Sequence, residues 1–355
     1  MIIVLGIAVG LWAVGAMMGA PRNQRFAMIG VLWIGVVALH FLLPGGHPLR
    51  LATGADARIW LILGGFVALG AAYFAGIGRL KRHMALPLAV TSQSAFRPVE
   101  LDRYARHIML REIGGPGQRR LKDAKVLVIG AGGLGSPALL YLAAAGVGVL
   151  GVIDDDLVEG SNLQRQIIHA DPRIGMAKVQ SAAVAMKALN PFIEVRPYHR
   201  RMTEDIAADL IGDYDLVLDG SDNFDTRYLV NKVCVALRKP LISGAITQWE
   251  GQLSLFDPAH GSPCYACIFP VRPAPGMVPT CAEAGVAAPL PGVIGAMMAM
   301  EAVKYITGAG QTLAGRLMIH DALFAETRVI GVKRRMDCAV CGDAAGLASP
   351  RLDLQ

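Results

Sequence analysis

The sequence predicts an α/β fold, a doubly wound Rossmann-like sheet with a four-cysteine zinc site, preceded by three transmembrane helices. Three features support this prediction: a glycine-rich turn between an apolar run and an apolar helix, three long stretches without formal charge near the N-terminus, and two Cys-x-x-Cys pairs in the C-terminal third. Hydrophobic residues make up 54% of the 355 residues and the mean hydropathy is +0.44. Both values are high for a soluble protein, which favours membrane helices.

The first 83 residues are predicted to form the membrane region. Its spans are expected at 2–20, 26–43 and 59–78, since each stretch is long enough to cross a hydrocarbon core of roughly 30 Å as a helix. Basic residues follow the first and third spans, at Arg22, Arg25, Arg79, Lys81 and Arg82. By the positive-inside rule these basic segments face the cytoplasm. We therefore expect a multi-pass protein of the inner (cytoplasmic) membrane, with its larger folded part in the cytoplasm.

The rest of the chain is predicted to contain a linker, one folded domain and a tail. The linker is placed at 84–100, the domain at 101–342 and the tail at 343–355. The apolar stretch from Pro289 to Thr307 is long enough for a further span, but Glu301 and Lys304 favour a buried helix of the domain. The net charge of +6 is modest and partly belongs to the N-terminal basic clusters, so we expect no nucleic-acid partner.

A glycine-rich turn is the most informative feature of the domain. The apolar run 125–129 leads into glycines at the GxGxxG spacing, an apolar helix follows from about Leu134, and the next strand, 149–153, ends at Asp154. Glycines let the backbone approach phosphates, a helix N-terminus presents free N–H groups, and an acidic residue at the next strand tip suits ribose hydroxyls. The predicted nucleotide-binding residues are Gly130, Gly132, Gly133, Gly135 and Asp154. A tight strand-to-helix turn without a ligand is the alternative.

Three polar residues follow this turn where a dinucleotide dehydrogenase would not need them. Asn162, Arg165 and Lys178 supply one neutral donor and two cations close in sequence to the predicted phosphate site. Two cations suit a triphosphate, whose negative charge must be neutralised as pyrophosphate leaves. Ordinary solvent exposure is the alternative for Arg165 and Lys178.

Asp222 lies just beyond another buried strand, 215–219. A carboxylate at this end of a parallel strand faces the ligand crevice, and its oxygens suit Mg²⁺. An N-cap of the following helix is the alternative.

The cysteines predict a metal site. Cys264 and Cys267 form one pair, and Cys338 and Cys341 form a second about 70 residues later. Four thiolates with no open position would hold a structural Zn²⁺, whereas a redox-active pair is the alternative. Cys234, within an apolar helix, is predicted to belong to the core.

Four segments resemble the ThiF/MoeB/HesA family of adenylyltransferases, which are related to ubiquitin-activating enzymes. They are GAGGLGSPALLYLAAAGVG at 130–148, SNLQRQ at 161–166, GMAKVQ at 175–180 and LDGSDNFDTR at 218–227. The resemblance extends from about Leu101 to Gly342 and identifies 101–342 as an adenylation domain. It implies ATP-dependent adenylation of the C-terminal glycine of a small ubiquitin-like sulfur carrier ending in Gly-Gly, with Mg²⁺ at Asp222.

The resemblance also implies partners and two further site residues. Arg106 matches an arginine that reaches the ATP site of the partner subunit in a homodimer. Cys281 matches a position where some members place a sulfur-transferring or acyl-accepting cysteine. The segment 280–290 is similar to the molybdopterin branch, so a carrier of the molybdopterin synthase small-subunit type is expected, with the thiamin-pathway carrier as the alternative. A rhodanese-like extension is absent, so a separate sulfur donor is expected.

Two other function classes remain open at this point. One is an NAD-dependent oxidoreductase, which would bind NAD and not ATP. The other is a non-catalytic membrane scaffold that binds carrier and nucleotide without turnover. The joint presence of Arg106, Asp154, Asn162, Arg165, Lys178 and Asp222 favours an enzyme over a scaffold.

Overall fold

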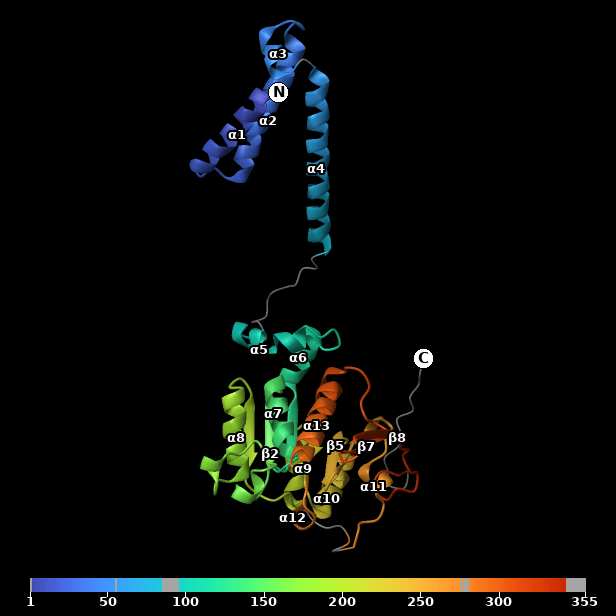
Figure 1. Ribbon diagram of the computed structural model, residues 1–355. Helices are drawn as coiled ribbons and strands as arrows, with labels where there is room; N and C mark the ends of the chain where they lie inside the picture. Colours follow the sequence, from blue (N-terminus) through green and yellow to red (C-terminus); the bar gives the residue numbers. More distant parts are fainter. Residues whose placement is uncertain (1, 55, 85–95, 275–276, 278–280, 343–355) are drawn as a thin grey trace. The chain divides into compact units, whose positions relative to one another are not determined.

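The structure is a computed structural model that describes residues 2–54, 56–84, 96–274, 277 and 281–342. It divides into two compact units, Met1–Gln93 and Ser94–Gln355 (Figure 1).

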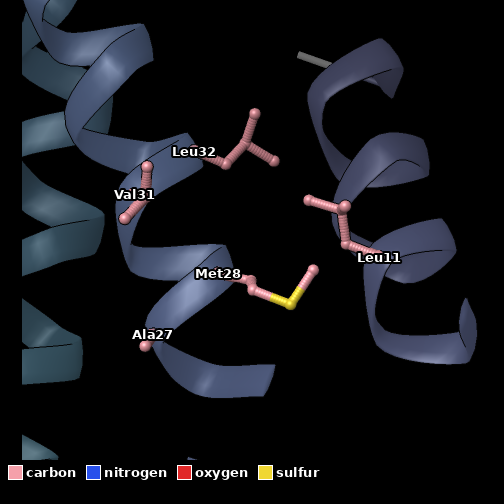
Figure 2. A pocket seen from close by; sticks show the side chains of 5 residues that line it. All are labelled: Leu11, Ala27, Met28, Val31 and Leu32. Atoms are coloured by element: carbon pink, nitrogen blue, oxygen red, sulfur yellow. The ribbon is translucent and has the colours of Figure 1, made fainter. Parts of the chain in front are cut away.

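The N-terminal unit is a small helical assembly. Its helices are α1 Ile2–Met17, α2 Arg22–Leu42, α3 Pro48–Thr53 and α4 Ala57–Met84. Its buried apolar cluster contains Val4, Val36 and Trp60, and the indole N–H of Trp33 donates to the Trp60 carbonyl oxygen at 3.0 Å. Figure 2 shows an apolar pocket between α1 and α2, where the Leu11 side chain faces those of α2. Most of the large apolar side chains that the structure describes in this unit are exposed.

The structure corrects the prediction of three membrane spans. Among the described residues, one helix, Asn23–Leu42 in α2, is long and apolar enough to cross a membrane. Helix α1 has 16 residues, or about 24 Å at 1.5 Å per residue, which is shorter than a hydrocarbon core of roughly 30 Å. It ends at a turn in which Gly19 has φ +71° and Pro21 follows. Among the residues of α4 whose side chains the structure describes, the continuous apolar stretch runs from Ala57 to Tyr73.

The C-terminal unit is built on an eight-stranded sheet in the order β3-β2-β1-β4-β5-β6-β7-β8. The strands are β1 Lys125–Ile129, β2 Val149–Ile153, β3 Glu194–Tyr198, β4 Leu216–Asp219, β5 Leu241–Thr247, β6 Glu250–Phe256, β7 Arg316–Asp321 and β8 Glu326–Gly331. Strands β1 to β5 pair in parallel, and β5 to β8 pair antiparallel. The predicted doubly wound α/β fold is thus confirmed.

Helices cover both faces of the parallel part of the sheet. The main helices are α5 Pro98–Ile108, α6 Gly114–Asp123, α7 Gly135–Ala145, α8 Lys178–Leu189, α9 Glu204–Gly212, α10 Phe224–Ala236 and α13 Pro289–Thr307; the short ones are α11 Tyr265–Ile268 and α12 Cys281–Ala284. Alternate residues of β1 enter two cores: Val126 and Val128 pack with α7, α8 and α13, whereas Leu127 and Ile129 pack with α9 and α10. In Figure 1, α7 (green) and α13 (orange) lie side by side. Because α13 is part of this core, its interpretation as a helix of the domain is confirmed.

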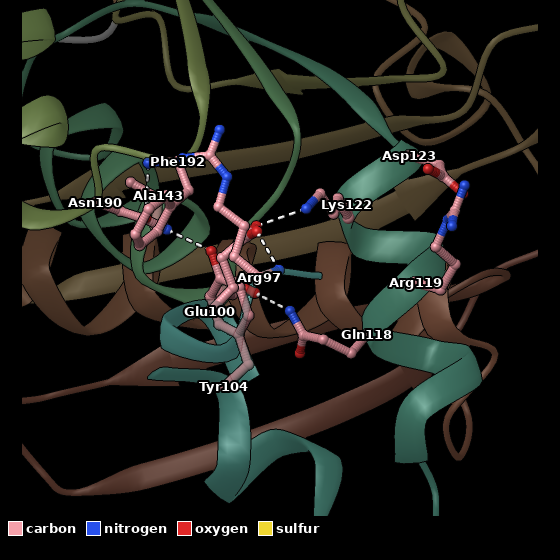
Figure 3. A network of polar contacts seen from close by, with 11 residues as sticks. Arg97, Glu100, Tyr104, Gln118, Arg119, Lys122, Asp123, Ala143, Asn190 and Phe192 are labelled. Atoms are coloured by element: carbon pink, nitrogen blue, oxygen red, sulfur yellow. Dashed lines mark hydrogen bonds and ion pairs between the residues drawn. The ribbon is translucent and has the colours of Figure 1, made fainter. Parts of the chain in front are cut away.

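Figure 3 shows the polar network that fixes α5. Glu100 accepts from Lys122 of α6 at 2.6 Å, and the Tyr104 hydroxyl accepts from the Asn190 amide at 2.8 Å. The same Asn190 amide nitrogen donates to the Ala143 carbonyl oxygen near the end of α7. Helix α5 is therefore attached beside the C-terminal end of α7.

Candidate nucleotide site

The candidate site lies where the carboxyl ends of β1 and β4 meet. From β1 the chain proceeds to β2 and β3 on one side, whereas β4 and β5 lie on the other, so this pair is the topological switch point of the sheet. The turns after the two strands are in contact: Gly220 N–H donates to the Ile129 carbonyl oxygen at 3.0 Å. A Cβ on Gly130 would lie 3.2 Å from the Gly220 carbonyl oxygen. Ligands of open α/β sheets bind in such crevices.

The glycine turn has the backbone geometry of a phosphate cradle. Gly130 has φ +89°, and a Cβ on Gly135 would lie only 1.9 Å from the Gly130 carbonyl oxygen. The N–H groups of Gly132, Gly133 and Leu134 have no acceptor among the described residues. Free amides at the N-terminus of α7 form an anion-binding site. This geometry supports the predicted cradle over a turn without a ligand.

Asp154 lies at the tip of β2, beside the turn. One carboxylate oxygen accepts the Ala131 N–H at 2.7 Å and the other accepts the Asp156 N–H at 2.9 Å. Burial raises the pKa of the Asp154 carboxyl, and the charge of Lys178 acts in the opposite direction. Each oxygen keeps a further lone pair, so the predicted ribose contact remains chemically possible.

The predicted cations are gathered at the same edge of the sheet. Lys178, the first residue of α8, is buried, and its Nζ lies 2.6 Å from an oxygen of the exposed Asp156. The Arg165 guanidinium donates to the Asn162 side-chain oxygen at 3.1 Å. A Cβ on Gly133 would lie 3.9 Å from Arg165 Cγ, so this arginine is next to the cradle. Buried Lys178 does not fit the alternative of a solvent-exposed residue.

Asp222 lies in the loop between β4 and α10, two residues beyond Gly220. The N-cap of α10 is Asn223, whose side-chain oxygen accepts the Thr226 N–H at 2.9 Å. Asp222 itself is exposed, and the capping alternative therefore does not apply to it. Its exposed carboxylate is chemically able to bind a cation, and the Mg²⁺ site at Asp222 stays a prediction.

A buried ion pair supports this loop, and the sequence did not reveal its role at the site. Arg227 NH1 lies 3.7 Å from Asp219, and the guanidinium also donates to the carbonyl oxygens of Ser221 and Gly244. Asp219 in turn accepts the Ser221 N–H at 3.0 Å. The pair therefore holds both ends of the segment that leads to Asp222.

Arg106 is remote from the cradle of its own chain. It is exposed on α5, whose Tyr104 is attached beside the C-terminal end of α7. The cradle lies at the opposite, N-terminal end of the same 11-residue helix. The structure thus brings together all the predicted nucleotide-binding residues except Arg106.

The four predicted zinc ligands converge. The Sγ atoms of Cys264, Cys267, Cys338 and Cys341 are buried and all lie within 4.8 Å of one another. Three separations are 3.9, 3.7 and 3.4 Å, close to the roughly 3.8 Å edge of a tetrahedron with 2.3 Å Zn–S bonds. The donor set fits Zn²⁺, and convergence of all four sulfurs favours a metal site over a redox-active pair.

The other two cysteines have different positions. Cys234 is buried in α10, as predicted, and burial raises the pKa of its thiol. The backbone of Cys281 begins α12, whereas its side chain lies outside the described residues.

Comparison with known proteins agrees with this geometry. The ThiF family model matches residues 104–340. A sulfur carrier protein adenylyltransferase of Thermus thermophilus is 51% identical over 69% of this chain and 92% of its own length. The SAMP-activating enzyme E1 of Haloferax volcanii is 47% identical over 69% and 90%, and the probable adenylyltransferase/sulfurtransferase MoeZ of Mycobacterium tuberculosis is 49% identical over 70% and 64%.

Solved structures share the fold. E. coli MccB with MccA-N7isoASN superposes with a TM-score of 0.61 at 24% identity, covering 68% of this chain and 74% of that one. PaaA superposes with a TM-score of 0.61 at 22% identity, covering 82% and 92%. The chain therefore belongs to the ThiF family.

Proposed function

We propose that the protein is an adenylyltransferase that uses ATP to activate the C-terminal glycine of a small ubiquitin-like sulfur-carrier protein. The observation that carries this proposal is the cradle of free amides, flanked by Asp154, Arg165 and buried Lys178. The relatives named as sulfur carrier protein adenylyltransferase and SAMP-activating enzyme E1, which match nearly along their whole length, support the substrate class.

The reaction is an acyl adenylation. A carboxylate oxygen of the carrier's terminal glycine attacks the α-phosphorus of ATP and forms a new P–O bond. The bond from the α-phosphorus to the oxygen that bridges to the β-phosphate breaks, and its electron pair leaves with pyrophosphate. The second product is the acyl-AMP. A carboxylate is already ionised at neutral pH, so no general base is needed, and catalysis consists of positioning and charge neutralisation.

The chain supplies these functions from separate elements. The amides of Gly132 and Gly133 hold phosphate oxygens, and Asp154 binds the ribose. Arg165 and Lys178 neutralise the leaving pyrophosphate. Asp222 would hold Mg²⁺, which supplies further charge neutralisation when bound. The four cysteines would hold a Zn²⁺ that joins α11 to the end of the domain and has no part in the reaction.

The position of Arg106 supports a homodimer in which each chain completes the site of its partner. This can be tested by mixing an Arg106→Ala chain with a Lys178→Ala chain. Each variant alone should be inactive. A mixed dimer should regain part of the activity, because one of its two sites has an intact cradle and an intact arginine. Failure of mixing to restore any exchange would exclude action between subunits.

The preferred carrier is of the molybdopterin synthase small-subunit type, and the carrier of the thiamin pathway is the alternative. A separate protein would then supply sulfur to the acyl-AMP. The name of the relative MoeZ, a probable adenylyltransferase/sulfurtransferase, supports a product destined for sulfur transfer.

The N-terminal unit would attach the enzyme to the cytoplasmic membrane through α2, with the catalytic unit in the cytoplasm. Exposed apolar side chains such as Val31 and Ile34 on α2 support this attachment. Alkaline carbonate extraction of membranes tests it. A chain that is released into the soluble fraction would not be anchored by α2.

The deciding experiment is ATP–pyrophosphate exchange with the full chain in detergent and candidate carriers, each with and without its terminal glycine. Exchange with an intact carrier alone is expected. Asp222→Ala should abolish exchange without unfolding the protein, whereas Asp225→Ala, a neighbouring exposed carboxylate, should not. ATP binding without exchange with any carrier would favour the scaffold, and binding of NAD but not ATP would favour the oxidoreductase.

A further inference from the structure

His169 is a buried histidine that joins two parts of the candidate nucleotide site. Its Nε2 lies 2.9 Å from the Ala131 carbonyl oxygen in the glycine turn, and its Nδ1 lies 2.9 Å from the Ser181 Oγ in α8. His169 is only 7% exposed, and Ser181 and Ala131 are fully buried. Ser181 lies three residues after Lys178, on the same face of the helix one turn further on.

The contacts define the protonation of the ring. A carbonyl oxygen can only accept a hydrogen bond, so Nε2 carries the proton and donates to Ala131. In the neutral ring Nδ1 then accepts from the Ser181 hydroxyl. Burial lowers the pKa of the imidazole; the hydrogen bond to Ala131 opposes this shift, and the charges of Lys178 and Arg173 act in the same direction as burial. Both contacts are therefore those of the neutral ring.

The Ala131 bond controls the direction of a cradle amide. The peptide bond between Ala131 and Gly132 is planar and trans, so its C=O and N–H point in opposite directions. A carbonyl held toward the buried imidazole thus aims the Gly132 N–H away from the core. That N–H is one of the groups without an acceptor among the described residues.

The preceding peptide is held as well, which closes a circuit of contacts. Ala131 N–H donates to Asp154, Asp154 accepts from the Asp156 N–H, and Asp156 pairs with Lys178. Helix α8 connects Lys178 to Ser181, and His169 connects Ser181 back to Ala131. The glycine turn and Lys178 are thereby connected by two routes. One passes through Asp154 and Asp156, and the other passes through Ser181 and His169.

We propose that His169 is a positioning residue for nucleotide phosphate binding: it orients the Ala131–Gly132 peptide so that the Gly132 amide and Lys178 bind the same triphosphate. This proposal deepens the proposed function and rests on it. His169 does not touch the reacting atoms. It acts through the backbone of the cradle.

Two amide substitutions separate the two contacts. The Nε2 of glutamine in His169→Gln reaches the place of the imidazole Nε2 and can keep the donor to Ala131. The amide of His169→Asn reaches only the place of Nδ1, so the Ser181 contact is kept and the Ala131 contact is lost. Binding of α,β-methylene-ATP to the full chain in detergent would be measured by calorimetry, with thermal unfolding as the control for folding.

We expect His169→Asn to weaken binding of the analogue about tenfold, the effect of one lost hydrogen bond at a buried site. His169→Gln should stay within about threefold of the parent chain. Wild-type affinity in His169→Asn would overturn the proposal, and so would an equal loss in both variants, since the Ala131 bond would then not be responsible.

Two further results complete the test. If His169→Asn does not fold, Ser181→Ala replaces it: removal of the hydroxyl that holds the ring should weaken binding several-fold, and unchanged affinity would overturn the proposal. Binding of the analogue by the parent chain without exchange with any carrier would remove the proposed adenylation but leave the role of His169 to be judged from the binding data. A parent chain that binds no analogue would overturn both.

Discussion

Among alanine substitutions in the glycine turn, Gly135→Ala should destabilise the fold the most. The new Cβ would lie 1.9 Å from the Gly130 carbonyl oxygen and 2.9 Å from its carbon. Both are backbone atoms, so no side chain can move aside. Relief requires α7 to separate from the end of β1, where Leu139 and Val128 belong to one core.

The cost should be at the upper end of overpacking, about 3 kcal/mol. For a unit of this size that lowers the midpoint of thermal unfolding by roughly 6–12 °C. Gly132→Ala is the matched control, because its Cβ would meet nothing closer than Gln166 Nε2 at 3.8 Å. We expect Gly132→Ala to unfold near the parent midpoint and yet to bind ATP more weakly, since the methyl group occupies space that a phosphate would need.

Differential scanning calorimetry of the full chain in detergent measures both midpoints, and ATP titration of the same samples measures affinity. The reasoning would be refuted by a Gly135→Ala chain that unfolds at the parent temperature, or by a Gly132→Ala chain with parent affinity for ATP. The first result would show that the turn is not closely packed, and the second that Gly132 does not face the nucleotide.

Three further outcomes are expected. Cys338→Ser should lower the zinc content below one per chain and lower the unfolding temperature, as measured by atomic absorption and calorimetry; parent zinc content would refute the four-cysteine site. Arg227→Leu leaves the carboxylate of Asp219 buried without its cation and should cost about 3–5 kcal/mol, whereas Asp225→Ala, which breaks an exposed pair, should cost less than about 1 kcal/mol in chemical denaturation. The folded-state pKa of His169 is lowered, so the contribution of His169 to the free energy of unfolding is full above its ordinary pKa of 6.5 and is lost as the pH falls below that value. In that pH window the unfolding midpoint of His169→Gln should fall less steeply than that of the parent chain. An identical dependence on pH in the two chains would contradict this.

Local backbone chemistry explains why much of the fold was predictable. The apolar run of β1 and the glycines after it signal a buried strand and a close turn, and both are determined by residues adjacent in sequence. The cysteine pairs were predictable for a different reason, since each pair carries its own short spacing. Asp154 followed from its place at the tip of the next strand.

The unpredicted parts depend on contacts between distant residues. His169 reaches Ala131 across 38 positions, and Arg227 reaches Gly244 across 17. Neither contact has a local pattern in the sequence. The prediction of a first span at 2–20 failed because a hydropathy window does not register that the turn at Gly19 and Pro21 ends α1 at Met17.

The pairing of Lys178 with Asp156 shows how the site can keep a buried cation and still offer it to a triphosphate. Removing a lysine from water is costly unless an anion accompanies it. Asp156 supplies that anion, yet its side chain is 65% exposed whereas that of Lys178 is 6% exposed. A phosphate that approaches Lys178 therefore competes with a carboxylate that water can solvate once it is released. Release of Asp156 therefore costs little free energy, because water hydrates its exposed carboxylate. The Lys178 ammonium group keeps an anionic partner throughout, first Asp156 and then the phosphate.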